Sequence, residues 1–294
     1  MLNVAAGAAS LGAERARAIH GACARAATTG VLDWLSPGKA FDVAFTGDPD
    51  AVKASLRELV RDEWLLDLNV VPASNRRKKL LIADMDSTII GCECIDELAD
   101  HVGLKPKVAA ITERAMRGEL DFPSALRERV ALLKGLPLDA LAQVYAERVR
   151  LNPGARELTA TMRAHGAHTV LVSGGFTYFT QRVAEKAGFE TQQGNRLADD
   201  GRALTGRVEE PILGREAKLR ALEHEAARVG CSPLDALAVG DGANDLDMIG
   251  RAGLGVAYHA KPIVAVAAGA SIAHGDLTGL LYLQGYREDE IRKD

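Results

Sequence analysis

Leu80-Leu-Ile-Ala-Asp-Met-Asp-Ser-Thr-Ile-Ile90 is the stretch that decides the fold, because an apolar run leads directly into two carboxylates and two hydroxyls. A short apolar run that ends in polar residues is typical of a buried strand and the turn after it. In open parallel sheets, ligands bind beyond the carboxyl ends of the strands. We therefore expect Asp84 and Asp86 to lie at the reactive edge of such a sheet.

The composition is that of a globular protein with a substantial core. The chain has 294 residues, of which 47% are hydrophobic and 26% are charged, and this length favours one large domain with a smaller one. The formal net charge of −4 offers no basic footprint for nucleic acid or a membrane surface. The basic cluster Arg76–Lys79 is interpreted as a solvated linker before the buried strand, with a nucleic-acid contact as the weaker alternative.

Neither targeting signals nor disulfides are expected. No apolar stretch reaches the roughly 18 residues of a membrane-spanning helix, and no signal-peptide pattern is found, so we expect a cytoplasmic protein. Four cysteines are too few for a disulfide framework and fit reduced thiols. Cys92 and Cys94 are close together, but Cys23 and Cys231 do not form a second close pair, so a zinc site is not favoured.

Residues 1–76 are expected to form a small accessory α+β domain. Their pattern could be part of a ferredoxin-like sandwich, but it is short by at least one strand. The turn-forming residues before the basic cluster mark the boundary of this domain. The elements predicted from periodicity are a helix at Ala13–Ala27, a strand at Phe41–Phe45, a helix at Ala51–Arg61 and a strand at Trp64–Val71.

After Asp86 the pattern changes from strand to helix for roughly 60 residues. A crossover between parallel strands normally needs only one helix. Several short helices therefore predict a cap at about residues 95–150, inserted into a catalytic domain that covers residues 77–294. The four helices are predicted at Ile95–Val102, Lys107–Arg117, Phe122–Lys134 and Leu138–Val149.

Beyond the cap, strands alternate with helices, which indicates a doubly wound parallel sheet of the Rossmann-like α/β class. One buried strand, Thr169–Val172, ends in Ser173-Gly-Gly175, and another, Ala236–Val239, ends in Gly240-Asp-Gly-Ala-Asn-Asp245. The other predicted elements are a helix at Pro153–Gly166 with Asn152 as its N-cap, a helix at Tyr178–Ala187, an edge hairpin within Phe189–Val208, a helix at Gly214–Val229, a short helix up to Arg251 and a last strand at Leu254–Ala257.

Three predicted strand ends bring together groups that suit a phosphorylated ligand. Asp84 and Asp241 offer the carboxylate oxygens that Mg²⁺ prefers. Ser173, backbone N–H groups and Lys218 suit the oxygens of a phosphate. Each feature alone is more often structural, as a turn, a cap or a solvated lysine. Their joint placement at separate strand ends predicts phosphoryl transfer without a nucleotide-binding P-loop, whose GxxxxGK[ST] pattern is absent.

The motifs, in this order, resemble those of the haloacid dehalogenase-like phosphatases. Two further segments resemble the members of that family that act on phosphoserine, and the resemblance runs from about residue 78 to about residue 285. It implies Mg²⁺-dependent hydrolysis of O-phospho-L-serine to L-serine and phosphate through an aspartyl-phosphate, the last step of L-serine biosynthesis. The motifs are Asp84-Met-Asp-Ser-Thr88, Ser173-Gly-Gly175, Lys218 and Gly240–Asp245, and the further segments are Asp84–Glu97 and Arg129–Pro137.

The resemblance implies how the acidic residues divide the chemistry. Asp84 would attack the phosphorus, since a carboxylate is ionised at neutral pH and needs no base. Asp86 would protonate the departing serine oxygen and then activate water. Asp84, the backbone carbonyl of Asp86, and Asp241 would hold Mg²⁺, which offsets the repulsion between the two anions.

The resemblance also implies how phosphate is held. The hydroxyl of Ser173, the N–H of Gly174 and the ammonium of Lys218 would bind the phosphoryl oxygens. Asn244 would contact the phosphate or the attacking water, and Asp245 would orient Lys218 or the metal-bound waters.

Substrate choice would rest on Glu93 and Arg129, which by the resemblance bind the ammonium and the carboxylate of serine. Without the resemblance, both would be interpreted as members of surface ion pairs, and Met116 and Phe122, which would shield the site, as core residues. The alternatives that remain are a related phosphatase or phosphotransferase acting on another small phosphomonoester, and a regulatory amino-acid binder. Neither nucleic acid nor membrane is expected as a partner, whereas a homodimer is compatible with the sequence.

Overall fold

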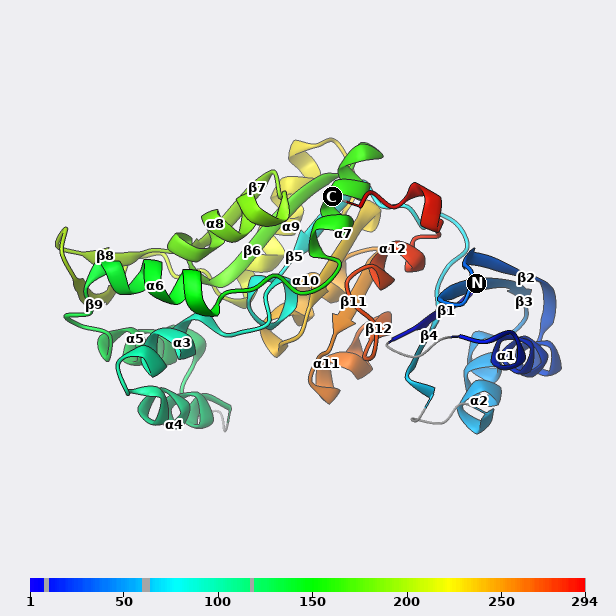
Figure 1. The fold of residues 1–294 in the computed structure, drawn as a ribbon, viewed down its shortest axis with the longest axis horizontal. Helices are drawn as coiled ribbons and strands as arrows, with labels where there is room; N and C mark the ends of the chain where they lie inside the picture. The colour runs from blue at the N-terminus through cyan, green and yellow to red at the C-terminus, as the bar shows by residue number, and fades with distance from the viewer. Residues whose placement is uncertain (8–10, 60–63, 117–118, 294) are drawn as a thin grey trace.

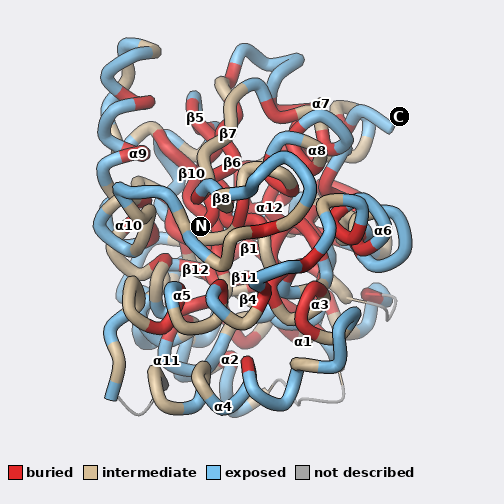
Figure 2. The backbone as a smooth tube through the Cα atoms, turned by 90° about the vertical axis from the view of Figure 1, so that its left-hand side faces the viewer, coloured by how far each residue is buried: buried red, intermediate tan, exposed pale blue. Residues whose placement is uncertain are grey.

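The computed structural model describes residues 1–7, 11–59, 64–116 and 119–293. Two sheets organise the chain: a four-stranded antiparallel sheet near the N-terminus and a six-stranded parallel sheet that carries most of the core (Figure 1). Figure 2 shows the strands of the parallel sheet as a buried centre, with exposed residues on the outer helices. A search of the described residues finds no helix with the length and apolar character needed to cross a membrane.

The six-stranded sheet is parallel throughout and has the strand order β12-β11-β10-β5-β6-β7. The chain builds outward from β5 on one side and from β10 on the other, so the order reverses between these two strands. Ligands bind at such a reversal in doubly wound sheets. The strands are β5 (Leu80–Ala83), β6 (His168–Phe176), β7 (Thr191–Asn195), β10 (Ala236–Gly240), β11 (Leu254–Tyr258) and β12 (Ala270–Ile272).

Both faces of this sheet are covered, which explains why its strands read as continuous apolar runs. Leu80 and Ile82 pack in one core with Leu222 of α9, and Leu81 and Ala83 face the opposite core. The predicted doubly wound fold is therefore confirmed. The helices around the sheet are α7 (Ala155–Ala164), α8 (Thr177–Ala187), α9 (Arg215–Arg228), α10 (Leu246–Arg251), α11 (Pro262–Ala267) and α12 (Gly279–Leu283).

The predicted helical insert is also confirmed. Two chain segments join it to the sheet, and they pair with each other: Ile90 bridges Leu151, and the N–H of Asn152 donates to the carbonyl of Ile89 (2.8 Å). A hairpin packs against α5 at the edge of the insert. The insert contains α3 (Cys94–His101), α4 (Lys105–Met116), α5 (Phe122–Ala131) and α6 (Leu138–Arg148), and the hairpin is β8 (Leu197–Asp199) with β9 (Leu204–Val208).

The N-terminal region corrects the expectation that a strand is missing. Its elements follow the β-α-β-β-α-β order of a ferredoxin-like sandwich, with the sheet order β2-β3-β1-β4. Sequence reasoning missed β1 and β2. Four of the five β1 residues are buried, so β1 lacks the alternation that marks a strand. The elements are β1 (Leu2–Ala6), α1 (Ala13–Ala26), β2 (Thr28–Ser36), β3 (Ala40–Thr46), α2 (Pro49–Leu59) and β4 (Leu66–Val70).

Three smaller expectations were wrong. The basic cluster is not simply a solvated linker, because Lys78 is buried and Arg76 forms an ion pair with Asp42 at 2.5 Å. Helix α7 is capped by Gly154, since the side chain of Asn152 is drawn away to the carbonyl of Thr88 (2.7 Å). The predicted last strand, β11, is followed by the three-residue strand β12, and β7 joins β6 as a parallel edge strand before the hairpin.

Candidate active site

The chain leaves β5 in a tight turn, Met85–Ile89, that presents the two predicted carboxylates. The N–H of Asp84 donates to the carbonyl of Val239 (3.0 Å), which ties the start of the turn to β10. The carboxylate of Asp84 accepts the N–H of Met85 (2.8 Å). Ser87 has a φ of 55°, a left-handed conformation that is uncommon outside glycine and often marks a functional turn.

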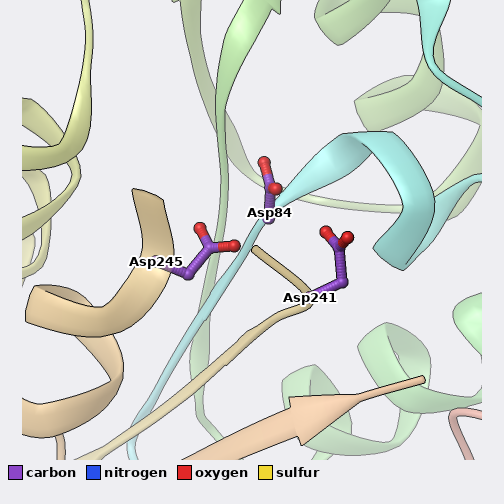
Figure 3. A group of neighbouring side chains, drawn as sticks. All are labelled: Asp84, Asp241 and Asp245. Atoms are coloured by element: carbon purple, nitrogen blue, oxygen red, sulfur yellow. The ribbon is translucent and has the colours of Figure 1, made fainter. Parts of the chain in front are cut away.

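An acidic cluster lies where β5 and β10 end. Carboxylate oxygens of Asp84, Asp241 and Asp245 lie within 4.8 Å of one another and point toward a common centre (Figure 3). Lys218 of α9 reaches into this cluster, with its Nζ 2.7 Å from Asp84 and 2.6 Å from Asp245. Both Lys218 and Asp245 are 0% exposed. The buried ammonium of Lys218 therefore contacts two of the three carboxylates, and the cluster keeps excess negative charge.

This imbalance of charge shifts the pKa of the cluster's members. Burial and the charge of Asp245 raise the pKa of Asp84 well above its ordinary value, although Lys218 opposes them. Burial, Asp245 and Glu93 raise the pKa of Asp241 to about 6. Burial alone would lower the pKa of Lys218, but Asp245 and Asp84 outweigh it and raise that pKa. Binding of a cation would relieve this repulsion.

Asp86 lies beside the Ser-Gly-Gly turn rather than within the acidic cluster. Its carboxylate accepts the hydroxyl of Ser173 (3.1 Å) and the N–H of Cys94 (2.9 Å). Burial and the charge of Glu93 raise the pKa of Asp86 to about 7, although these hydrogen bonds oppose the rise. A side chain at Gly175 would come within 2.7 Å of the Asp86 carboxylate, so a larger residue there would have to displace that carboxylate.

The Ser-Gly-Gly turn lies within the irregular end of β6, which continues to Phe176, rather than after the strand as predicted. It is held by a residue that sequence reasoning missed. Asn195, at the end of β7, donates to the carbonyls of Gly174 (2.8 Å) and Leu213 (3.1 Å) and accepts the N–H of Leu213 (2.7 Å). It thereby joins the turn to the segment that leads into α9 and Lys218. The available signal was a polar residue at the end of a predicted strand, which is weak because such residues are common in turns.

Glu93 lies at the N-cap of α3, where the cap begins, and Arg129 lies in α5. Glu93 accepts the hydroxyl of Ser87 (2.7 Å), which links it to the turn after β5. The half-buried guanidinium of Arg129 donates to the carbonyl of Ala125 (3.3 Å). Burial lowers the pKa of Arg129, while the charges of Asp96, Glu93 and Asp86 oppose that shift. Arg129 and Glu93 therefore share a neighbourhood with Asp86.

Phe122 closes the cap side of the site, since a side chain at Gly174 would come within 2.9 Å of its ring. The side chain of Met116, the other expected shield, lies outside the described residues. Asn244 is half-buried, and its Oδ1 would come within 2.3 Å of a side chain at Gly242. All nine predicted site residues therefore lie around the carboxyl ends of β5, β6 and β10 or on the cap beside them.

A doubly wound sheet with an aspartate pair after its first strand, a buried lysine and a helical cap defines a hydrolase of the haloacid dehalogenase-like class. The chain belongs to this family: the family model for haloacid dehalogenase-like hydrolases matches residues 81–249.

Within this family, the chain is similar to phosphoserine phosphatases. It is 49% identical over 210 residues to a phosphoserine phosphatase of Polaromonas sp., a match that covers 70% of this chain and 89% of the relative. The unliganded structure of a probable phosphoserine phosphatase from Vibrio cholerae superposes with a TM-score of 0.79 at 33% identity and covers 98% of this chain and 87% of that one. The structure of a phospho-aspartyl intermediate analogue of a phosphoserine phosphatase superposes with a TM-score of 0.65 at 40% identity. The match covers 70% of this chain and 98% of that one.

Proposed function

We propose that this chain is a phosphoserine phosphatase, which hydrolyses O-phospho-L-serine to L-serine and phosphate in the last step of L-serine biosynthesis. The observation that carries the proposal is the acidic cluster around Lys218, with Glu93 hydrogen-bonded to Ser87 of the turn after β5 and Arg129 on the cap helix α5. The cluster suits a phosphate with a divalent cation, and the cap residues suit an amino acid. The similarity to phosphoserine phosphatases supports the same reaction.

The donor set fits Mg²⁺. Carboxylate oxygens are hard ligands, and the raised pKa values of Asp84 and Asp241 indicate more negative charge than Lys218 offsets. Asp84, Asp241 and the backbone carbonyl of Asp86 would hold the ion. Asp245 is less available, because its two oxygens accept from Lys218 and from the N–H of Gly242 (3.1 Å). When bound, the ion neutralises negative charge on the nucleophile and the phosphate.

The first half of the reaction uses Asp84 as the nucleophile. Its carboxylate attacks phosphorus, and the bond from phosphorus to the serine oxygen breaks. Asp86 gives its proton to that oxygen as L-serine leaves. Lys218, Ser173 and the N–H of Gly174 hold the phosphoryl oxygens, while the short contact between Lys218 and Asp84 keeps the nucleophile oriented.

The second half releases phosphate. Asp86, now ionised, takes a proton from water, which attacks phosphorus and frees Asp84. Asn244 would contact the phosphate or this water. A pKa of about 7 for Asp86 suits a group that must both give and take a proton near neutral pH. Serine would be recognised by Glu93 at its ammonium and by Arg129 at its carboxylate.

A comparison of substrates tests this proposal. We expect the wild-type enzyme to hydrolyse O-phospho-L-serine far better than phosphoethanolamine, which lacks the carboxylate, and EDTA to abolish both activities. Because charged hydrogen bonds contribute about 1.5–3 kcal/mol, Arg129→Ala should raise KM for phosphoserine by roughly 10- to 100-fold. It should change KM for phosphoethanolamine little.

Arg127→Ala is the matched control, since Arg127 lies on the same helix but pairs with the exposed Glu210 (2.6 Å). It should leave both substrates unaffected. Equal losses on both substrates in Arg129→Ala, or equal wild-type rates on the two, would contradict recognition of the amino acid.

A further inference from the structure

The N-terminal sheet contacts the catalytic sheet at its edge strand β12. Strand β4 lies beside β12 (Figure 1). Asn69 of β4 pairs with the backbone of Ser271 in both directions: its Nδ2 donates to the carbonyl (2.9 Å), and its Oδ1 accepts the N–H (2.7 Å). The side chain of Asn69 thus makes the two hydrogen bonds that a neighbouring strand would make with Ser271. These bonds attach β4 to β12.

Asp67, two residues earlier on β4, holds the turn that follows β12. One carboxylate oxygen accepts the N–H groups of Ala273 (2.7 Å) and His274 (3.1 Å), and the other accepts that of Gly275 (2.8 Å). Asp67 is 4% exposed, so these hydrogen bonds replace the water that its charge would otherwise require. A side chain at Gly275 would come within 2.9 Å of this carboxylate.

The same turn fixes His259, the first residue after β11. The Nε2 of His259 lies 2.8 Å from the carbonyl of Gly275, and because a carbonyl can only accept, Nε2 carries the proton. The N–H of His259 donates to the carbonyl of Ile272 (2.8 Å). His259 has a φ of 43°, a conformation that persists only where its surroundings hold it.

Two residues beyond His259 the chain reaches the acidic cluster. The N–H of Lys261 donates to the carbonyl of Asp241 (3.3 Å), and the charge of Lys261 lowers the pKa of Asp241 against the effect of burial. A continuous set of hydrogen bonds therefore runs from Asp67, through Gly275 and His259, to the segment that contacts Asp241.

We propose that Asp67, a residue outside the catalytic sheet, is a positioning residue for the cation site. It holds the 273–275 turn, which holds His259 in its left-handed conformation and thereby places Lys261 against Asp241. The N-terminal sheet thus contributes to divalent-cation affinity without touching the cation. This proposal rests on the metal site proposed above.

Asp42 provides a matched control within the same sheet. It is also 4% exposed and also links the N-terminal region to the rest of the chain, through Arg76. However, Arg76 also donates to the carbonyls of Tyr282 and Leu283, both in α12. Loss of the Asp42 contact should weaken the attachment of the sheet without loosening the turn at Asp241.

The test is titration of the full-length, metal-free protein with Mn²⁺, following the free ion by electron paramagnetic resonance in the absence of substrate. We expect Asp67→Asn to weaken Mn²⁺ binding by about tenfold, at the lower end of the effect of changing groups that orient metal ligands. Asp42→Asn should lower the melting temperature about as much as Asp67→Asn does, but it should leave Mn²⁺ affinity unchanged. Equal affinities in wild type and Asp67→Asn, or equal losses in both variants, would overturn the proposal.

His259→Asn keeps the proposal testable if Asp67→Asn does not fold. Asparagine tolerates the left-handed conformation but is too short to reach Gly275, so Mn²⁺ affinity should fall. Where both single variants fold, the variant that carries both substitutions should bind Mn²⁺ as tightly as the single variant with the lower affinity, because both substitutions interrupt the same set of hydrogen bonds. Additive losses, or full affinity in His259→Asn, would overturn the path. A wild type that binds no Mn²⁺ would refute the metal site itself.

Discussion

The catalytic sheet carries charged clusters at its two opposite ends, and their balance of charge differs. At the carboxyl ends of the strands, Asp84, Asp241 and Asp245 lie together, and Lys218 contacts two of them, Asp84 and Asp245. At the amino end of β6, Glu225 contacts Arg228 (2.7 Å) and His168 (3.4 Å), and His168 also contacts Glu190 (3.1 Å). The first cluster has excess negative charge. In the second cluster, each carboxylate contacts at least one basic side chain.

Two equally buried acids, one from each cluster, respond in opposite directions. Asp84 and Glu225 are each 4% exposed. Burial and Asp245 raise the pKa of Asp84 despite Lys218. Burial also acts to raise the pKa of Glu225, but Arg228, His224 and His168 outweigh it and lower that pKa. Burial alone therefore does not identify a functional acid. Burial without a matching charge does, because the missing charge is what a cation or substrate supplies.

The largest expected effect comes from Asp84→Asn. Loss of the nucleophile should lower kcat for O-phospho-L-serine by on the order of 10⁴-fold or more. The metal-free protein should keep or raise its melting temperature, because the substitution removes a carboxylate from a cluster with excess negative charge. Phosphate release and thermal unfolding in EDTA measure the two effects. Substantial turnover would exclude Asp84 as the nucleophile, and a large drop in melting temperature would show that the cluster is balanced after all.

The next effect is the dependence of stability on pH. A carboxyl group whose pKa is raised by folding binds more protons in the folded state, so its contribution is present at low pH and lost as pH rises. The stabilising contribution of Asp241 should be lost as pH rises from about 4 through its folded-state pKa of about 6, and that of Asp86 as pH rises from about 4 through its pKa of about 7. Melting temperatures in EDTA and in saturating MgCl₂ should therefore diverge with pH, by on the order of 5 °C at pH 8. An equal effect of Mg²⁺ at pH 5 and pH 8 would contradict this.

The elements of the catalytic sheet were predictable because their signals are local. Apolar runs that end at Asp84, Ser173 and Asp241 mark buried strands, and parallel strands bring their carboxyl ends to one edge. The cap helices have regular spacing. Strand β1 was not predictable in this way, because Asn3 interrupts its apolar run and the run ends in alanines, which have low β propensity. Strand β12, with three residues, is too short to show a pattern.

The site residues also differ in whether a local sequence pattern predicts them. Asp84, Lys218 and Asp241 follow recognisable strands or motifs, whereas Glu93 and Arg129 depended on the resemblance, since spacing alone favours an ion pair. Asn195 and Asp67 act through the backbones of distant segments, which no local pattern reveals. Asp245 was expected to orient Lys218, and its oxygen lies 2.6 Å from that ammonium.

The smallest effect should come from Glu225→Gln, which tests the balanced cluster. Because Arg228 is nearly half exposed, loss of its partner should cost only about 1 kcal/mol of unfolding free energy. The lowered pKa of Glu225 places this contribution above about pH 4.5, and it is lost as pH falls. Denaturant unfolding of variant and wild type at pH 7 and pH 4 should therefore show a difference that shrinks in acid.

Phosphatase activity and Mn²⁺ affinity should stay within about twofold of wild type in the same variant, because the cluster lies at the far end of β6 from Ser173. Arg228→Gln is the matched partner: the double variant should be no less stable than the less stable of the two single ones if the pair acts as a unit. A loss of activity comparable to that of Asp84→Asn would mean that the two ends of the sheet are coupled. The contrast between a balanced and an unbalanced cluster would then no longer separate structure from function.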